Sequence, residues 1–172
     1  MATRDVVSFS GGARYSVTTG RGDGLVSLAQ NALTVPPPTS SVSSVIRAFA
    51  LKRFTATDMI YLLGGHTIGI AHCALFKDRL YNYKNTGKPD PSMDLSLQII
   101  MGRGVLQFDQ DLASDRLSKS TVAAIARSSD FNAWFGQAMF KLGATQVLTG
   151  KQWQIRKSCR AVNLPTLTSL FN

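Results

Sequence analysis

The sequence contains no glutamate. All ten acidic residues are aspartates, against 19 lysines and arginines, which gives a formal net charge of +9. Any carboxylate chemistry must therefore come from aspartate. The basic residues are spread singly and form no dense Lys/Arg block, a pattern typical of a solvated basic surface and not of a nucleic-acid partner. Such a surface adheres to acidic polymers such as polysaccharides.

Cysteines are scarce and long apolar runs are missing. Cys73 and Cys159 are the only cysteines, and one pair does not distinguish a disulfide from two free thiols. No apolar stretch approaches the length that spans a membrane. The first residues lack the basic region and apolar core of a signal peptide. The length of 172 residues and the 44% hydrophobic content predict one monomeric domain over residues 1–172, with a real core.

The most informative stretch is an apolar helical pattern that runs into two glycines and a histidine. Thr55 with Asp58 three residues later is close to a capping box, which predicts that a helix begins here. Gly64 and Gly65 carry no side chain, so a flat group can approach the backbone closely. His66 then lies at the end of this helix in apolar surroundings. One inward face of the helix comprises Ala56, Met59, Ile60 and Leu63.

Two interpretations of His66 are open from the residues alone. It is either an axial metal ligand or a buried histidine satisfied by one hydrogen bond, and composition favours the second.

The rest of the chain reads mainly as helices. A wide apolar stripe with three aromatic residues predicts a helix that Ser129 or Asp130 caps and Gly143 ends, and this stripe is expected to be core and not a cofactor wall. Alternation in Tyr15-Ser16-Val17 predicts a short strand. Further helices are expected over 25–32, 40–51, 94–100 and 118–127, with a loop over 85–91.

The segment Gly64-Gly65-His66-Thr67-Ile68-Gly69, followed by Cys73, resembles the proximal haem-ligand segment of plant secretory (class III) haem peroxidases. Other segments along nearly the whole chain are similar to that family as well. They are residues 10–12, 15–21, 36–38, 78–82, 90–91, 104–110, 141–143, 147–150, 155–156 and 159–163.

The resemblance implies a mainly α fold: the proximal half of the plant haem peroxidase fold, with at most short β-hairpin elements. It implies that His66 binds the iron of haem b through Nε2 and that Asp109 accepts the Nδ1 proton, which makes the imidazole a stronger electron donor. It also implies that Thr67 helps to bind calcium, although one threonine is not a site for an ion that takes six to eight oxygens. Pro36 matches the entrance used by aromatic donors.

The implied activity is the hydrogen peroxide-dependent one-electron oxidation of phenolic donors, in peroxide removal and the response to oxidative stress. The implied partners are hydrogen peroxide and small phenols, without nucleic acid or membrane. Members of the family are secreted or vacuolar, whereas the first residues here do not look like a signal peptide.

Two departures from the family pattern limit this interpretation. The family's distal arginine, histidine and phenylalanine have no counterpart, and an internal loop with a cysteine and calcium ligands is missing near residues 98–101. Both are interpreted as deletions. The family partners of Cys73 and Cys159 lie in the missing parts, so neither family disulfide is expected, and a Cys73–Cys159 bridge would need a rearranged fold.

Three functions are therefore weighed. The first is a truncated haem peroxidase. The second is a catalytically impaired fragment that binds haem weakly or not at all, because loss of a general acid–base group costs about a hundred- to ten-thousandfold in rate. The third is a metal or nucleic-acid binding module built on His66, His72 and Cys73, which is disfavoured because two ligands on one face are too few for structural zinc.

Overall fold

A computed structural model describes residues 1–93 and 105–163 of the chain. The fold is mainly α, as the sequence predicts. Its α-helices are α1 (Ala2–Phe9), α2 (Val42–Leu51), α3 (Ala56–Leu63), α4 (Lys77–Tyr81), α6 (Gln107–Ser114), α7 (Lys119–Arg127) and α8 (Phe131–Gly143). The short helix expected over 94–100 lies outside the described residues.

Short 3-10 turns and one small sheet complete the described structure. The turns are η1 (Ala29–Thr34), η2 (Gly64–Thr67), η3 (Cys73–Leu75), η4 (Tyr83–Asn85) and η5 (Gly150–Gln152). Strands β1 (Asp23–Gly24) and β2 (Trp153–Gln154) pair antiparallel, with Asp23 opposite Gln154. This two-residue ribbon agrees with the expectation of at most short β elements.

Helices α2 and α3 begin where the sequence places their caps. The Ser41 side chain accepts a hydrogen bond from the Ser44 amide at the start of α2. Thr55 and Asp58 form a reciprocal capping box at the start of α3, which satisfies two amide donors that the first helical turn leaves free. These caps fix the entry of both helices and so set which faces turn inward.

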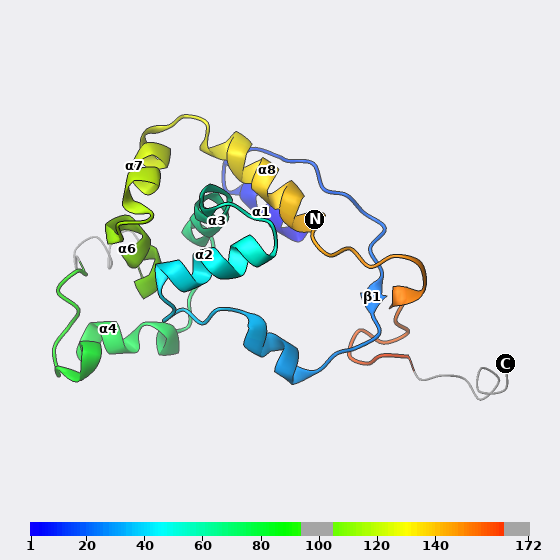
Figure 1. The fold of residues 1–172 in the computed structure, drawn as a ribbon, viewed down its shortest axis with the longest axis horizontal. Helices are drawn as coiled ribbons and strands as arrows, with labels where there is room; N and C mark the ends of the chain where they lie inside the picture. The colour runs from blue at the N-terminus through cyan, green and yellow to red at the C-terminus, as the bar shows by residue number, and fades with distance from the viewer. Residues whose placement is uncertain (94–104, 164–172) are drawn as a thin grey trace.

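The core joins α2 and α3 to α6 and α7. Met59 is fully buried, and the other buried members are Val42, Val45, Ile60, Phe108 and Leu112. Figure 1 shows α3 in the middle of the molecule, with α2 against it and α6 and α7 toward one end. Periodicity predicts the residues of α2 and α3 that face this core correctly, but it does not predict Tyr61, which is buried on another side of α3.

Helix α8 packs along the other side of α3. The Phe131 and Phe135 rings stack with centroids 5.7 Å apart, and Tyr61 of α3 lies 5.7 Å from Phe131 and 6.4 Å from Trp134. Lys141 donates to Asp58 at 2.6 Å and ties the end of α8 to the start of α3. The stripe of α8 is thus core at Phe135, while Trp134 remains 49% exposed.

A buried ion pair anchors α4. Arg79 donates through Nε to Asp90 Oδ2 at 2.9 Å and through a terminal nitrogen to the Val105 carbonyl at 2.8 Å. Asp90 also accepts from the amide and hydroxyl of Ser92. Both charged side chains are 1% exposed, so this pair holds the loop after α4 against the rest of the molecule.

Several expectations are wrong. Tyr15, Ser16 and Val17 form no strand, because Tyr15 packs edge-on against Phe135 and the segment runs along α8 without a partner strand. The helix expected over 25–32 is instead η1, shifted toward its C-terminal side. Helix α1 was not expected. Gly143 is the last residue of α8, but the cap position belongs to Ala144.

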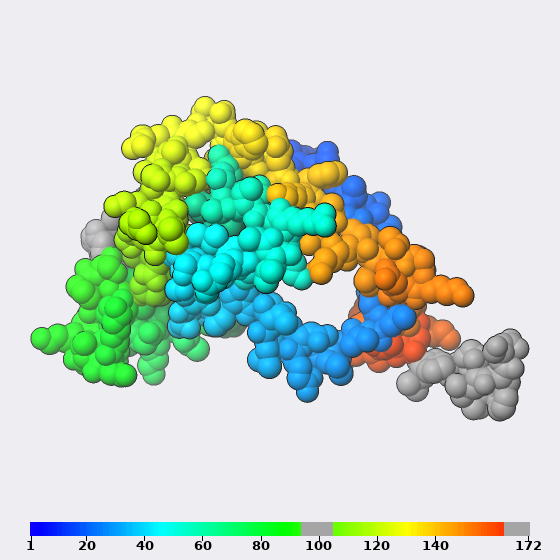
Figure 2. Space-filling model, in the orientation of Figure 1, coloured from blue at the N-terminus to red at the C-terminus, as the bar shows by residue number. Residues whose placement is uncertain are grey.

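The periphery of the molecule is open. Figure 2 shows an opening through the molecule between the η1 segment and the chain around η5. Cys73 and Cys159 are both exposed and free. No helix in residues 1–93 and 105–163 combines the length and apolarity that crossing a membrane requires.

Candidate functional site

The turn η2 holds His66 immediately after α3. The Thr67 hydroxyl donates to the Gly64 carbonyl at 2.9 Å, and the Ile68 amide donates to the Gly65 carbonyl at 3.1 Å. These bonds tighten the last turn of the helix and then end it, since Ile68 is extended. His66 therefore projects from the end of an element whose other end is fixed by the Thr55 capping box.

Asp109 meets His66 from a separate helix. It lies in the first turn of α6, between the buried Phe108 and the rest of that helix. His66 Nδ1 is 3.0 Å from Asp109 Oδ1 and 3.2 Å from Oδ2. The structure thus brings together the two residues that the resemblance assigns to neighbouring roles, although 43 positions separate them in sequence.

Asp109 affects both the pKa of His66 and the ring nitrogen on which its proton lies. The hydrogen bond to Asp109 raises the pKa of His66, burial opposes this, and the charge of Asp109 adds to the increase. With Nδ1–H donated to the carboxylate, Nε2 is the nitrogen that carries the lone pair in the neutral ring. The His66 side chain is 45% exposed, so a group from outside can reach it.

The space beside Gly64 and Gly65 is filled by aromatic rings of α8. A Cβ atom added at Gly64 would lie 2.5 Å from Phe131 Cζ, and one at Gly65 would lie 3.4 Å from Phe135. The flat groups that the glycines admit are therefore phenyl rings of the chain itself. The sequence did not identify these two neighbours of the histidine turn, although the aromatic stripe over 131–142 contained the signal.

Thr67 and Pro36 are not drawn into this pair. Thr67 is exposed, and its hydroxyl is used within the turn. Pro36 lies half-buried between η1 and α2. Within residues 1–93 and 105–163, no group of three or more His, Cys or Asp side chains is placed to hold a metal ion.

His72 and Cys73 do not extend the site. The helical segment ends at Thr67, and Ile68 is extended, so the shared helical face expected for His66 and Cys73 does not exist. Both His72 and Cys73 are exposed. The metal-binding module based on these three residues consequently has no grouping of ligands to support it.

A haem group is compatible with the residues at His66. The imidazole has one nitrogen held by Asp109 and the other available, which is the arrangement that suits an axial iron ligand. Ile70, four residues later, is 97% exposed.

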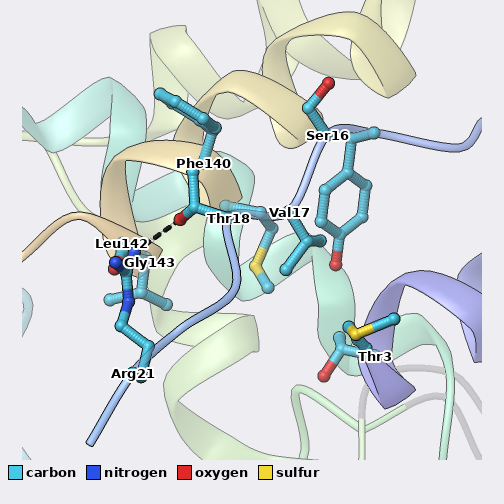
Figure 3. Close-up of a pocket in the computed structure, with 11 residues that line it drawn as sticks. Thr3, Ser16, Val17, Thr18, Arg21, Phe140, Leu142 and Gly143 are labelled. Atoms are coloured by element: carbon cyan, nitrogen blue, oxygen red, sulfur yellow. Dashed lines mark hydrogen bonds between the residues drawn. The ribbon is translucent and has the colours of Figure 1, made fainter.

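Two cavities lie elsewhere, along α8. One has a volume of about 320 Å³ and is lined by the start of α1, the segment around Val17 and the end of α8 (Figure 3). The other has a volume of about 1070 Å³ and includes Trp134 and Lys141. Neither is lined by His66 or Asp109.

Comparisons with known proteins define the class. The sequence profile of the family described as peroxidase matches residues 1–102 of this chain. The chain therefore belongs to the peroxidase family, and the relatives that it matches are plant proteins named as peroxidases.

The sequences of individual relatives align with almost the whole chain. Peroxidase 57 of Arabidopsis thaliana is 40% identical and aligns with 95% of this chain and 62% of its own length. Peroxidase 60 of the same plant is 38% identical over 94% of this chain and 60% of its own length. Peroxidase 5 of Vitis vinifera is 33% identical, with 94% and 60% covered. The chain thus spans about three fifths of the length of these relatives.

The alignment with Peroxidase 57 also indicates a difference in length within the aligned region. The alignment with Peroxidase 57 extends over 194 positions, which exceeds the 172 residues of this chain. The relative therefore has residues within the aligned region that have no counterpart here. The sequence motifs predict one such internal loss near residues 98–101.

Proposed function

We propose that this chain forms the proximal half of a haem peroxidase domain, in which His66 is the axial ligand of haem b iron through Nε2. The observation that carries the proposal is the 3.0 Å hydrogen bond from His66 Nδ1 to Asp109. Turn η2 and helix α6, which are distant in sequence, together orient the His66 imidazole. Membership of the peroxidase family supports haem as the cofactor that this imidazole would bind. Residues 1–172 are taken as one partial domain.

Other residues of the chain would hold the His66 imidazole in position in two ways. Asp109 holds the proton on Nδ1 and fixes the tautomer, so that the Nε2 lone pair is directed to a metal. The capping box of α3 and the rings of Phe131 and Phe135 fix the turn that carries His66. When bound, haem would supply the redox chemistry, in which the two-electron reduction of hydrogen peroxide to water is balanced by one-electron oxidation of two donor molecules. Pro36 is the residue we propose for the entrance of the donor.

The family reaction proposed for the whole protein is the hydrogen peroxide-dependent oxidation of phenolic donors, which serves peroxide removal under oxidative stress. Peroxide cleavage needs a group that moves a proton between the two oxygens. The only other histidine is His72, which is exposed and precedes η3. We therefore propose that these 172 residues alone bind haem weakly and turn over peroxide slowly. Calcium is not assigned to the described residues.

Reconstitution with haemin tests this function. The purified chain should acquire a Soret band that His66→Ala removes and the matched variant His72→Ala retains. Guaiacol oxidation should be about a hundred- to ten-thousandfold below that of Peroxidase 57 prepared in the same way. Haem uptake that is equal in both histidine variants, or absent altogether, would contradict the ligand assignment. Rates close to Peroxidase 57 would contradict the impaired activity.

The location proposed from the family is secreted or vacuolar. The basic surface, with its net charge of +9, suits retention by acidic polysaccharide. Immunodetection in vacuoles and in apoplastic washing fluid, followed by release with salt, tests both statements. A signal confined to the cytosolic fraction would contradict them.

A further inference from the structure

The first turn of α6, which carries Asp109, is weakly held by its own backbone. Leu106 occupies the N-cap position, and its apolar side chain has no oxygen with which to cap the helix. The first backbone hydrogen bond, from the Gln110 amide to the Leu106 carbonyl, is 3.4 Å long, which exceeds the usual range of about 2.7–3.2 Å. The turn that sets the direction of the Asp109 carboxylate therefore depends on contacts made by side chains.

A hydrogen bond between two side chains closes the same turn. Gln107 Nε2 donates to Asp111 Oδ1 at 2.7 Å, and the contact is partly buried. Residues four apart on a helix are neighbours on one face. A hydrogen bond to a charged acceptor is roughly twice as strong as one between neutral groups. We call this bond the Gln107–Asp111 clamp.

The Gln107 amide is held in one orientation. A carboxylate only accepts hydrogen bonds, so the amide nitrogen and not the amide oxygen must face Asp111. Gln107 Oε1 is inaccessible to solvent and has no hydrogen-bond partner within the described part of the chain. A reversed amide would turn this oxygen toward the carboxylate and repel it. The backbone just before the clamp is also fixed, because Arg79 donates to the Val105 carbonyl at 2.8 Å.

The clamp leaves Asp109 free to meet His66. Each residue of an α-helix is rotated by about 100° from the one before it, so Asp109 lies on the opposite side of α6 from Gln107 and Asp111. The clamp occupies the Asp111 carboxylate, while Asp109 Oδ1 lies 3.0 Å from His66 Nδ1. One carboxylate of α6 thus holds the helical turn, and the other contacts the imidazole.

We propose that Gln107 is a positioning residue for His66, because its bond to Asp111 holds the first turn of α6 where Asp109 reaches Nδ1. The inference rests on the proposed function, which gives the His66–Asp109 pair its role, and extends that function to a residue that does not touch the imidazole. Without the clamp the first turn frays and the carboxylate moves away from Nδ1. The proton of the neutral ring then shifts to Nε2, which loses its lone pair for a metal.

The position of the proton on the neutral His66 ring tests the proposal. Ring ¹⁵N chemical shifts of the haem-free protein, at a pH above the titration of His66, report the ratio of the Nδ1–H to the Nε2–H tautomer, with His72 as the internal control. In Gln107→Ala this ratio should fall about two- to tenfold, the effect of losing one net hydrogen bond. Gln110→Ala is the matched control, since it removes the same side chain from the same helix and leaves the clamp intact.

Variants of Asp111 separate the clamp from the charge that takes part in it. Asp111→Asn keeps an oxygen that accepts from Gln107, so its tautomer ratio should stay close to that of the wild type. Asp111→Ala should lower the ratio as much as Gln107→Ala does. The double variant should show no further fall, because either change alone breaks the same bond. Circular dichroism should show the wild-type helix content in each variant.

Two results would overturn the positioning role. They are an unchanged tautomer ratio in Gln107→Ala and an equal fall in Gln110→Ala, which would mean that any loss of helix stability moves the proton. Asp109→Ala distinguishes this failure from failure of the proposed function. If the ratio falls in Asp109→Ala but not in Gln107→Ala, only the role of Gln107 is wrong. If it falls in neither variant, the His66–Asp109 pair itself is not kept in solution.

Discussion

At the scale of single residues, two hydrogen-bonded pairs of side chains join distant parts of the chain. Their spacing in the sequence does not by itself predict that they meet. His66 and Asp109 are 43 positions apart, and Arg79 and Asp90 are 11 apart. Periodicity relates only residues on one helix, so neither pair follows from it. Similarity to the family pointed to Asp109 as the partner of His66, and the geometry places the two side chains in contact.

The first prediction concerns the charge of Asp109. In Asp109→Asn the pKa of His66 should fall toward about 6.5, its ordinary value, because the hydrogen bond to the carboxylate is the main cause of the increase. An NMR titration of the ring protons in the haem-free protein measures this, with His72 as the internal control. An unchanged His66 pKa would show that the pair does not form in solution.

The same pair gives stability a pH dependence of known sign. The pKa of His66 is raised in the folded state, so the stabilisation is fully present below about pH 6.5 and is lost as the pH rises through the folded pKa. The stability difference between wild type and Asp109→Asn should therefore be larger at pH 5.5 than at pH 8.5. Urea unfolding at the two pH values measures it, and an equal or opposite difference would refute the linkage.

The second prediction concerns the buried ion pair. Asp90→Ala should destabilise the protein by about 3–5 kcal/mol, because it leaves the Arg79 charge buried opposite an empty position. Asp78→Ala, at an exposed site in the first turn of α4, should cost less than about 1 kcal/mol. Urea unfolding compares them. Similar losses in both variants would mean that the 1% exposed pair is not kept in solution.

At the scale of elements, local signals predicted helices where apolar residues recur with a helical period. Helices α2, α3, α7 and α8 were expected close to their observed bounds, although of these four only α2 and α3 have a side-chain cap. Tyr15 to Val17 has the alternation of a strand but no neighbouring strand, since Phe135 offers it a ring contact instead. Helix α1, which was not expected, buries only Val7.

The third prediction tests the contact between α3 and α8. Gly64→Ala should cost about 1–3 kcal/mol of stability, because its Cβ would lie 2.5 Å from Phe131 Cζ and the ring must move. Gly64 has φ −57°, so backbone strain does not contribute. Gly65→Ala, whose Cβ lies 3.4 Å from Phe135, is the matched control and should cost less.

A double-mutant cycle tests whether the contact with the Phe131 ring causes the loss of stability in Gly64→Ala. Phe131→Leu removes the ring that the new methyl group meets, so Gly64→Ala should be less destabilising in that background than in wild type. Thermal unfolding of the four proteins provides the comparison. Equal costs in both backgrounds would place the effect of Gly64→Ala somewhere other than the aromatic contact.

At the scale of the whole molecule, one end is packed and the other is held by few contacts. The buried cluster of α2, α3, α6 and α7 includes no residue before Val42 or after Ile125, even when its partly buried neighbours are counted. The chain from residue 20 to 35 instead meets the C-terminal part through the two-residue ribbon and a hydrogen bond from Arg156 to the Gly24 carbonyl. Figure 2 shows the opening that separates this part from the body of the molecule.

This arrangement predicts two levels of local stability, because regions with few buried apolar contacts open at low free energy. Amides of α3 around Met59, which is fully buried, should exchange only through global unfolding. Amides of β1 and β2 should open independently and lose their protection at urea concentrations below the global transition. Native-state hydrogen exchange measures both sets in one experiment. Arg156→Ala, which removes the bond to Gly24, should speed exchange in β1 and β2 and leave α3 unchanged, whereas an equal effect on all three would mean that the ribbon unfolds together with the core.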